Sequence, residues 1–534
     1  MSFWPKVRKI PIILLNLTFY KQSVIMQQEN SHRSRRIARN TLMLYFRMIF
    51  LLIVGFYTSR VVLDALGEND YGIYSVVGGV VAMFTIISGA LNSAISRFIT
   101  FEMGKGADAC LNKVYSTSVT IQLILSVIVL LIIEPAGIWF IRNEMTIEPD
   151  RIPAAIIVLQ FSLISFVVNL MSVPQMASIT AHEKMSAYAY IGILDGILRL
   201  GVALLIVHSP IDRLVWYSAL MTFSVALVRM AYGLYCRRNF PECRYRPVFD
   251  RGLIKEMFSF AGWNFIGVTS GVLRDQGGNI LVNLFFGTAM NAARGVAVQL
   301  NSAVQGFVTN FMTAVNPQIT KSYASGERGY MLSLVRRSSK MSFFLLFIIA
   351  LPILFNTEYL LQIWLKNVPE HSAAFVRLFL VFALSESLSN SLITAQLATG
   401  NIRNYQIIVG GLQLMNLPVS YLFLKAGAPA QTTVAVSIVI SQICLVARLL
   451  LLKRMIGLSP GEFLTKVYMR VLVVAAAAVV LPVLLSGCLP DTFAGFCISV
   501  TVSVLSAALS ILFIGCAAEE RKMIISMIFT RKGE

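Results

Sequence analysis

The chain has 534 residues, of which 57% are hydrophobic and only 13% are charged, and its formal net charge is +19. Soluble domains usually carry about 25% charged residues, so this composition excludes a soluble globular chain, and its high apolar content excludes a disordered one. It is the composition of a polytopic helical membrane protein.

Apolar runs that are long enough to span a membrane recur along the whole chain. A spanning helix needs about 20 mostly apolar residues, and this rule predicts about fourteen spans. They are expected near residues 41–64, 71–95, 114–134, 153–174, 185–208, 214–236, 257–284, 292–315, 339–357, 373–396, 404–425, 431–452, 466–486 and 493–515. The expected fold class is therefore all-α, and the spans leave no room for an extra soluble domain.

The loops between these spans alternate in charge. One set, together with both tails, holds most of the basic residues, including Arg33, Arg35, Arg36, Arg39, Arg237, Arg238, Arg244 and Arg246. The other set holds the acidic residues Glu68, Asp70, Glu144, Glu148, Asp150 and Asp491. Because Lys and Arg stay on the cytoplasmic side, both termini are predicted to be cytoplasmic. The excess positive charge then faces anionic lipid, and no basic domain for nucleic acid is present.

The N-terminal segment has two readings. Lys6, Arg8 and Lys9 precede a short apolar run and imitate a signal peptide, but no small-residue cleavage site follows. The other hypothesis is that natural synthesis begins at Met26, ahead of the basic run, which N-terminal sequencing of the native protein would decide.

A weak internal repeat divides the chain into two halves. Residues 67–106 match 287–326 at Gly67/Gly287, Val76/Val296, Ala94/Ala314, Ile99/Ile319, Thr100/Thr320 and Gly106/Gly326. This register equates the second span with the eighth, so the two halves have the same orientation. Parallel repeats are typical of transporters, whose substrate site lies at the repeat interface. The predicted organisation is a basic N-terminal segment (1–40), an N-lobe (41–236), a cytoplasmic linker (237–256), a C-lobe (257–455), two added helices (456–515) and a cytoplasmic tail (516–534).

Polar side chains inside the spans are the candidate site residues, because such residues are costly in lipid and usually face a partner or a water-filled cavity. On 292–315, Arg294, Asn301 and Gln305 fall within one sector of about 80°. Arg47 lies on a shorter polar stripe of 41–64. We therefore expect substrate contacts from Arg47, Arg274, Asn279, Arg294, Asn301 and Gln305.

Other charged residues in the spans have structural alternatives. Asp195 and Arg199 are spaced i, i+4, which favours an ion pair within one helix. Arg274 and Asp275 are adjacent and point in different directions, so separate partners are expected. Glu386 lies in a serine-rich patch, where it is either a functional acid or bonded to the neighbouring serines.

Motifs of catalysis and cofactor binding are missing from the sequence. There is no P-loop, GxSxG, HExxH or EF-hand loop, and the four histidines lie in unrelated places. No enzyme activity, cofactor or metal is therefore predicted. Any pumping has to use an ion gradient, the membrane potential or the gradient of the substrate itself.

Several short motifs carry a family resemblance. They are Arg39-Asn40-Thr41, Ser59-Arg60, the stretch from Leu66 to Tyr74, Arg97, Gly104, the stretch from Phe258 to Asn264, and the stretch from Gly278 to Gly287. Over most of residues 37–455 the chain resembles the polysaccharide repeat-unit flippases (O-antigen, Wzx-like transporters). These belong to the superfamily that includes the lipid II flippases and the MATE exporters.

The resemblance implies two six-helix lobes in a V that is open to one side at a time. It implies movement of an undecaprenyl-pyrophosphate-linked oligosaccharide from the inner to the outer leaflet of the bacterial cytoplasmic membrane. Lipid II flippases use arginines on their first and eighth helices, and Arg47 and Arg294 lie on comparable helices here. The implied partners are the lipid-linked glycan, membrane lipids and polysaccharide-assembly proteins. Asp275 or Glu386 would carry a coupling proton or sodium ion.

Two other functions are compatible with parts of the sequence. A cation-coupled, MATE-like exporter of small molecules would favour an acidic, aromatic cavity over several arginines. A membrane-embedded glycosyltransferase or polymerase would need catalytic residues in large outer loops, and the loops here are short. The flippase reading requires the arginines to border a hydrated space between the two bundles.

Overall fold

The computed structural model describes residues 12–82, 85–106, 109–143, 145, 147–209, 212–365, 368–486, 492–517 and 521, with side chains from Arg36 onward. Nearly all of this part is helical, as the apolar runs predict. Glu144, Cys488 and Asp491 and the side chain of Glu68 lie outside it.

The first half of the chain forms one bundle, the N-lobe. Its helices are α1 (Ile12–Ala82), α2 (Thr85–Gly104), α3 (Leu111–Asn143), α4 (Ile152–Ala181), α5 (Met185–Leu205) and α6 (Arg213–Asn239). In the N-lobe α1 packs on α5, and α4 packs on both α3 and α6.

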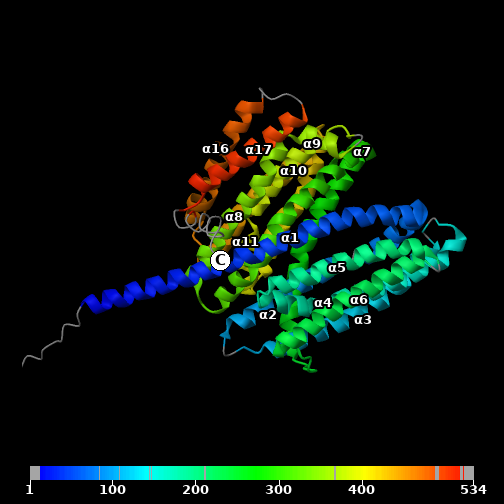
Figure 1. The fold of residues 1–534 in the computed structure, drawn as a ribbon, viewed down its shortest axis with the longest axis horizontal. Coiled ribbons are helices and arrows are strands. Elements are labelled where there is room, and N and C mark those ends of the chain that lie inside the picture. Colours follow the sequence, from blue (N-terminus) through cyan, green and yellow to red (C-terminus); the bar gives the residue numbers. More distant parts are fainter. Residues whose placement is uncertain are drawn as a thin grey trace, which may run out of the picture.

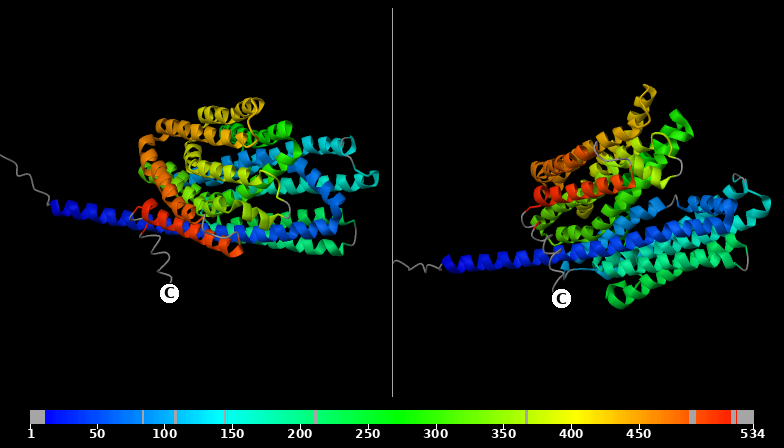
Figure 2. Two further views of the ribbon diagram at one scale, coloured as in Figure 1. Left: turned by 90° about the horizontal axis from the view of Figure 1, so that it is seen from above. Right: turned by 45° about the horizontal axis from the view of Figure 1, so that its top comes forward.

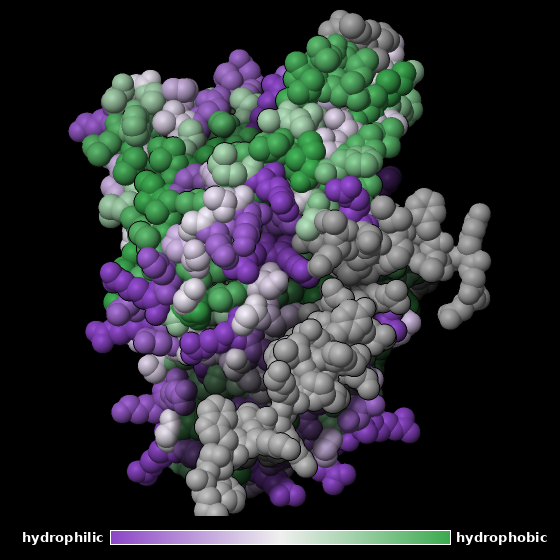
Figure 3. Space-filling model, turned by 90° about the vertical axis from the view of Figure 1, so that its left-hand side faces the viewer, coloured by the Kyte–Doolittle hydropathy of each residue, from purple (hydrophilic) through white to green (hydrophobic). Residues whose placement is uncertain are grey.

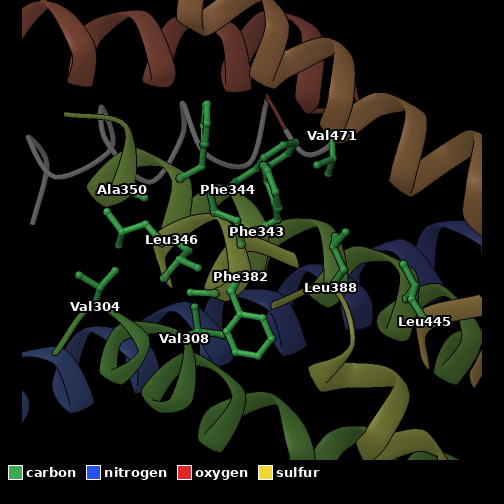
Figure 4. Close-up of a cluster of buried hydrophobic side chains, with 14 of the residues drawn as sticks. Val304, Val308, Phe343, Phe344, Leu346, Ala350, Phe382, Leu388, Leu445 and Val471 are labelled. Atoms are coloured by element: carbon green, nitrogen blue, oxygen red, sulfur yellow. The ribbon is translucent and has the colours of Figure 1, made fainter. Parts of the chain in front are cut away.

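The second half forms the C-lobe. Its helices are α7 (Arg251–Ala324), α8 (Arg328–Phe355), α9 (Thr357–Trp364), α10 (Ser372–Ser387), α11 (Asn390–Thr399), α12 (Arg403–Leu414), α13 (Asn416–Lys425) and α14 (Thr432–Ile456). The helices α15 (Pro460–Phe463), α16 (Met469–Ser486) and α17 (Phe493–Ser510) follow, and α16 and α17 pack on α8. Figure 4 shows the resulting core, where Phe343 and Phe344 of α8 lie between Phe382 of α10 and Val471 of α16.

The internal repeat has a counterpart in the backbone. The long helices α1 and α7 are each broken at a glycine, Gly67 with φ 77° and Gly287 with φ 78°. Gly106 and Gly326, the other matched pair, also have positive φ. Only glycine adopts such angles without a steric cost. In both halves, therefore, a glycine at the matched position allows the chain to leave the helical conformation.

Eleven helical segments in the described residues are long and apolar enough to cross a membrane. The predicted spans 257–284 and 292–315 are helical but are not among them, and neither is 71–95, which is helical in its described residues 71–82 and 85–95. The segments 257–284 and 292–315 are the halves of α7. Polar residues lower the mean hydropathy of these two segments, and most of the candidate site residues are among those polar residues. The count of about fourteen spans therefore stays a prediction.

The two lobes form a V (Figures 1 and 2). They converge at the end from which the N-terminal part of α1 projects, and they diverge towards the opposite end. We call the convergent end the basic end, because it carries Arg36, Lys105, Arg238, Lys321 and Arg328. Figure 3 views this end, where hydrophilic side chains gather between hydrophobic surfaces. It is the end that the charge pattern predicts to be cytoplasmic.

Candidate functional site

A cavity of about 560 Å³ borders both lobes. Most of its lining comes from α1, and α7 contributes Asn310. The lining residues are Arg47, Met48, Leu51, Leu52, Gly55, Ser59 and Asn310. Arg47 is the one formally charged residue among them, so the cavity combines a cationic group and two neutral polar groups with an apolar wall.

Arg47 lies on the wall of this cavity against α5. Its guanidinium carbon is 4.5 Å from the centroid of the Tyr188 ring, a cation–π contact. A Cβ atom at Gly192 would collide with Nε of Arg47, so this glycine makes room for the arginine as well as for helix packing. Within the described residues Arg47 forms no ion pair with a carboxylate, and its Nε has no hydrogen-bond partner. Its positive charge is therefore available to an anion in the cavity.

The lobes touch one another beside the cavity. The Tyr45 ring of α1 packs edge-on against the Phe307 ring of α7, with the centroids 5.4 Å apart. A Cβ atom at Gly306 would lie 3.2 Å from Sδ of Met48. These contacts bring the α1 stripe that contains Arg47 next to the part of α7 that contains Asn310.

At the basic end a buried carboxylate ties the lobes together. Glu183, in the turn between α4 and α5, is only 7% exposed. It accepts from Nε of Arg36 at 3.2 Å, from Nζ of Lys321 at 3.2 Å and from Nε2 of Gln318 at 3.1 Å. Burial lowers the pKa of Lys321, and the charge of Glu183 opposes this shift. Lys321 and Gln318 belong to the C-lobe, whereas Glu183 and Arg36 belong to the N-lobe, so these bonds join the two lobes. We call the four residues the Glu183 hub.

Residues of the family motifs also lie at the contact between the lobes. Arg97 of α2 donates to the carbonyl oxygen of Ala398 in α11 at 3.3 Å. Asn264 of α7 donates to the carbonyl oxygen of Ala90 in α2 at 3.3 Å. A Cβ atom at Gly104 would lie 2.7 Å from the carbonyl oxygen of Lys321, so only glycine allows α2 and α7 to approach this closely. The basic end is closed by these contacts and by the Glu183 hub.

Four of the predicted site residues form a separate group inside the C-lobe, the C-lobe arginine cluster, made up of Arg274, Asp275, Asn279 and Arg294. Arg294 is only 5% exposed, and it donates to Oδ1 of Asn279 and to the carbonyl oxygen of Asp275. Its guanidinium also lies 5.3 Å from the Phe379 ring centroid. The donors at Nη1 and Nη2 of Arg294 are thus met inside the C-lobe, while its Nε has no hydrogen-bond partner.

The prediction that Arg274 and Asp275 have separate partners is wrong. Nε of Arg274 lies 2.9 Å from Oδ1 of Asp275, so the adjacent residues pair with each other. The arginine side chain is long enough to fold back to its neighbour, and its guanidinium also packs on the Phe382 ring at 4.9 Å. The direction in which a side chain leaves the helix does not determine the position of the charged group at the end of a side chain as long as that of arginine.

The structure does not bring Arg47 and Arg294 together. Asn310, which shares the cavity with Arg47, is sixteen residues from Arg294 along α7, or about 24 Å at the rise of an α-helix. Asn301 and Gln305 lie between these two levels and are half-buried, and Oδ1 of Asn301 has no partner. One pyrophosphate group cannot contact both arginines in this conformation.

The remaining candidates have local partners. Arg199 and Asp195 form the ion pair that their spacing predicts, with Nε and Oδ2 3.0 Å apart. Glu386 lies 3.9 Å from Nη1 of Arg448 on α14, which also donates to Ser389 and Tyr405. Arg448 is only 2% exposed. Our sequence analysis missed it, although a lone arginine within the apolar run 431–452 is a visible signal.

Comparison with known proteins agrees with this architecture. The chain is similar to a MATE transporter solved in complex with MaD3S (12% identity, 79% of this chain and 97% of that chain, TM-score 0.69). It is also similar to a multidrug resistance MATE family transporter of the MOP superfamily in an outward-facing conformation (13% identity, 78% and 96%, TM-score 0.68).

A third similar structure is a MOP superfamily transporter from Pyrococcus furiosus Vc1 (DSM3638), whose title reports a binding pocket of reversed polarity and suggests a different function (12% identity, 79% and 96%, TM-score 0.68). At these identities the likeness shows the fold alone, which is that of the MATE transporters. No curated protein matches the sequence. The family described as polysaccharide biosynthesis protein matches residues 35–323, more than half of the chain, and the chain belongs to that family.

Proposed function

We propose that this membrane protein is a flippase that moves an undecaprenyl-pyrophosphate-linked oligosaccharide from the inner to the outer leaflet by alternating access. The observation that carries the proposal is the charge of the cavity beside α1. Its one charged lining residue is Arg47, and no carboxylate of the described residues pairs with it.

The chemistry of the lining suits the parts of such a substrate. A pyrophosphate is anionic and strongly hydrated, and a guanidinium offers it several planar donors that stay charged. Ser59 and Asn310 offer hydrogen bonds to sugar hydroxyls. The polyprenyl tail need not enter the cavity, because it can stay in the lipid beside the lobes.

The conformation described here corresponds to one half of the proposed cycle. The basic end is closed through the Glu183 hub, and the lobes diverge towards the other end (Figure 1). For a headgroup to enter from the cytoplasm, the bonds from Glu183 to Lys321 and Gln318 have to break. As the basic end opens, the opposite end closes, and the headgroup enters from the cytoplasm. When the lobes return to the conformation described here, the glycan is released outside.

The energy source is part of the proposal. A coupling proton or sodium ion would bind Asp275 or Glu386, each of which already faces an arginine. Coupling would therefore require the ion to displace a guanidinium. Transport by a variant with both acids neutralised, Asp275→Asn with Glu386→Gln, should lose its dependence on the ion gradient. An unchanged dependence would remove both residues from the mechanism.

We place the protein in the bacterial cytoplasmic membrane, with both termini in the cytoplasm and polysaccharide-assembly proteins as partners. The second candidate function is cation-coupled export of small molecules, which the MATE fold favours. An organic cation would meet Arg47 in this cavity without any acidic lining residue. We rank this function second because like charges repel.

The decisive test is reconstitution of the full chain in proteoliposomes. The lipid-linked oligosaccharide is incorporated in the membrane, and its exposure in each leaflet is followed with a sugar-modifying reagent. The proposal predicts protein-dependent exchange between leaflets and no proton-driven uptake of organic cations. Cation transport without lipid exchange would instead establish the exporter.

A further inference from the structure

A second pocket, of about 520 Å³, lies at the basic end and shares no lining residue with the first cavity. Phe98 of α2 forms one wall, and the beginning of α7 and the turn between α11 and α12 form the others. Its polar lining residues are Lys255, Glu256, Ser259, Asn401 and Arg403. Because its walls come from both lobes, this pocket exists in this form only while the basic end is closed.

A buried arginine stands directly behind the pocket wall. Arg97 is 8% exposed, and its guanidinium carbon lies 4.7 Å from the ring centroid of Phe98 and 5.7 Å from that of Phe260, both of which line the pocket. Its Nη2 donates to the carbonyl oxygen of Ala398, but its Nε has no partner. Among the described residues, no carboxylate forms an ion pair with it.

A glycine admits this guanidinium to the pocket wall. Gly400 lines the pocket with φ +77°, and a Cβ atom there would lie 2.5 Å from Nη2 of Arg97. Any other residue would be strained in this conformation and would also push the guanidinium away. The backbone at Gly400 therefore keeps Arg97 at the pocket.

The charges around the pocket favour an anion. Lys255 and Arg403 are exposed at its rim, and the Arg403 guanidinium stacks on Trp263 at 5.3 Å from the ring centroid. Glu256 is the one acidic lining residue. Arg97 is buried with no ion-pair partner among the described residues and with only the more distant charges of Glu256 and Glu102 opposite it, so an anion in the pocket would stabilise this site.

The surface next to the pocket is apolar. One helical turn beyond Trp263 on α7 lies Ile266, which is 41% exposed, and one turn beyond Arg403 on α12 lies Ile407, which is 48% exposed. The two helices pack side by side at this level, where Gln406 of α12 fills the space above Gly267 of α7. A cationic pocket that continues into exposed apolar surface matches an amphiphile with an anionic head.

We propose that this second pocket binds the phosphate group of an anionic membrane lipid, with its hydrocarbon chains against Ile266 and Ile407. Lys255 and Arg403 bind the phosphate, Ser259 and Asn401 donate hydrogen bonds, and Arg97 attracts the phosphate by its charge from behind the wall. The lipid joins α2 to α7 and α12, so it stabilises the closed basic end. This site is independent of Arg47 and of the transported substrate.

The test uses the purified full chain in neutral detergent and measures thermal unfolding against added lipid. Phosphatidylglycerol and undecaprenyl phosphate are the two sources of a lipid phosphate, and phosphatidylcholine and inorganic pyrophosphate are the controls. We expect one or both anionic lipids to raise the unfolding temperature in a saturable way, and the relative affinity of the two identifies the source. Equal stabilisation by phosphatidylcholine, or stabilisation by pyrophosphate alone, would overturn the proposal.

Variants locate the site. Removing two charged donors with Lys255→Ala and Arg403→Ala should lower the lipid affinity about tenfold or more. The matched control, Arg237→Ala with Arg238→Ala, removes the same charge from exposed residues of α6 at the same end. An equal loss of affinity in both double variants would mean attraction by surface charge alone and would refute the site.

Two single variants complete the design. Arg97→Met should lose most of the stabilisation by lipid. Its unfolding temperature without lipid is the reference for this comparison, because loss of the bond to Ala398 and removal of a buried charge act in opposite directions. Arg47→Ala should retain stabilisation by phosphatidylglycerol in full, whatever its effect on transport. Undiminished lipid stabilisation of the Arg97→Met variant would contradict the proposal.

Discussion

Arg47 and Arg294 are both arginines within the membrane-spanning bundles, but their surroundings are opposite. Arg294 is enclosed by the C-lobe and donates to Asn279 and to the backbone of Asp275. Arg47 lies at a cavity, with an aromatic ring beneath it and no carboxylate partner in the described residues. An arginine that is enclosed by its own lobe and bonded there stabilises the fold, whereas one that borders a cavity can bind a ligand. The comparison predicts that substitutions at the two positions have different consequences.

The largest expected effect is on transport in the Arg47→Ala variant. Loss of a charged hydrogen bond to pyrophosphate costs about 1.5–3 kcal/mol, so the rate of lipid exchange between leaflets should fall tenfold or more. The unfolding temperature should change little, because Arg47 forms no ion pair that the variant would break. Arg47→Lys should recover part of the rate, since it keeps the charge but not the planar donors. Normal transport by Arg47→Ala would remove this residue from the site.

Arg294→Ala should show the reverse pattern. It leaves Oδ1 of Asn279 without the Arg294 donor and removes a second donor from the carbonyl of Asp275, which should cost about 1–3 kcal/mol of stability. We expect a lower unfolding temperature in detergent, measured beside Arg47→Ala. Any loss of transport should scale with the loss of folded protein. A stable Arg294→Ala variant that does not transport would show that Arg294 contacts the substrate in another conformation.

Glu183→Gln should loosen the basic end. The variant loses charged hydrogen bonds to Lys321 and Arg36, so amide hydrogen exchange at residues 318–324 should become several-fold faster. Glu242→Gln is the matched control, because Glu242, in the linker after α6, pairs with His182 of the N-lobe at the same end and does not contact the C-lobe residues of the hub. Equal exchange rates in the two variants would show that the Glu183 hub does not hold the lobes together.

The smallest effect is expected from breaking the pair of Asp195 and Arg199 on α5. Half of the Arg199 side chain is exposed, and exposed pairs of this spacing contribute less than about 1 kcal/mol. Asp195→Asn should therefore change neither the unfolding temperature nor transport measurably. A strong transport defect with normal stability would instead assign Asp195 to the transport mechanism.

The positions of the helices and the repeat follow from the sequence because they depend on local properties. Long apolar runs predict the spans, and the breaks at Gly67 and Gly287 fall in the gaps between the predicted spans 41–64 and 71–95 and between 257–284 and 292–315. The partners of polar side chains do not follow in the same way. A helical wheel groups Arg294 with Asn301 and Gln305, but it contains no information on the neighbouring helix that encloses Arg294.

The Glu183 hub shows the same limit more clearly. Glu183 lies in a short turn outside every predicted span, and its partners Arg36, Gln318 and Lys321 are far away in the sequence. No periodicity connects residues that meet only after the two lobes pack. Arg448 is different, because an arginine inside an apolar run is recognisable before the fold is known.

The most direct test of the central claim is the affinity of purified protein for undecaprenyl pyrophosphate, measured by native mass spectrometry. The measurement is made in the double variant Lys255→Ala with Arg403→Ala, so that the second pocket does not contribute to binding. In this background the account predicts that adding Arg47→Ala weakens the affinity tenfold or more, while adding Arg294→Ala leaves it within about twofold. Unchanged binding on adding Arg47→Ala, or an equal loss on adding either substitution, would contradict it.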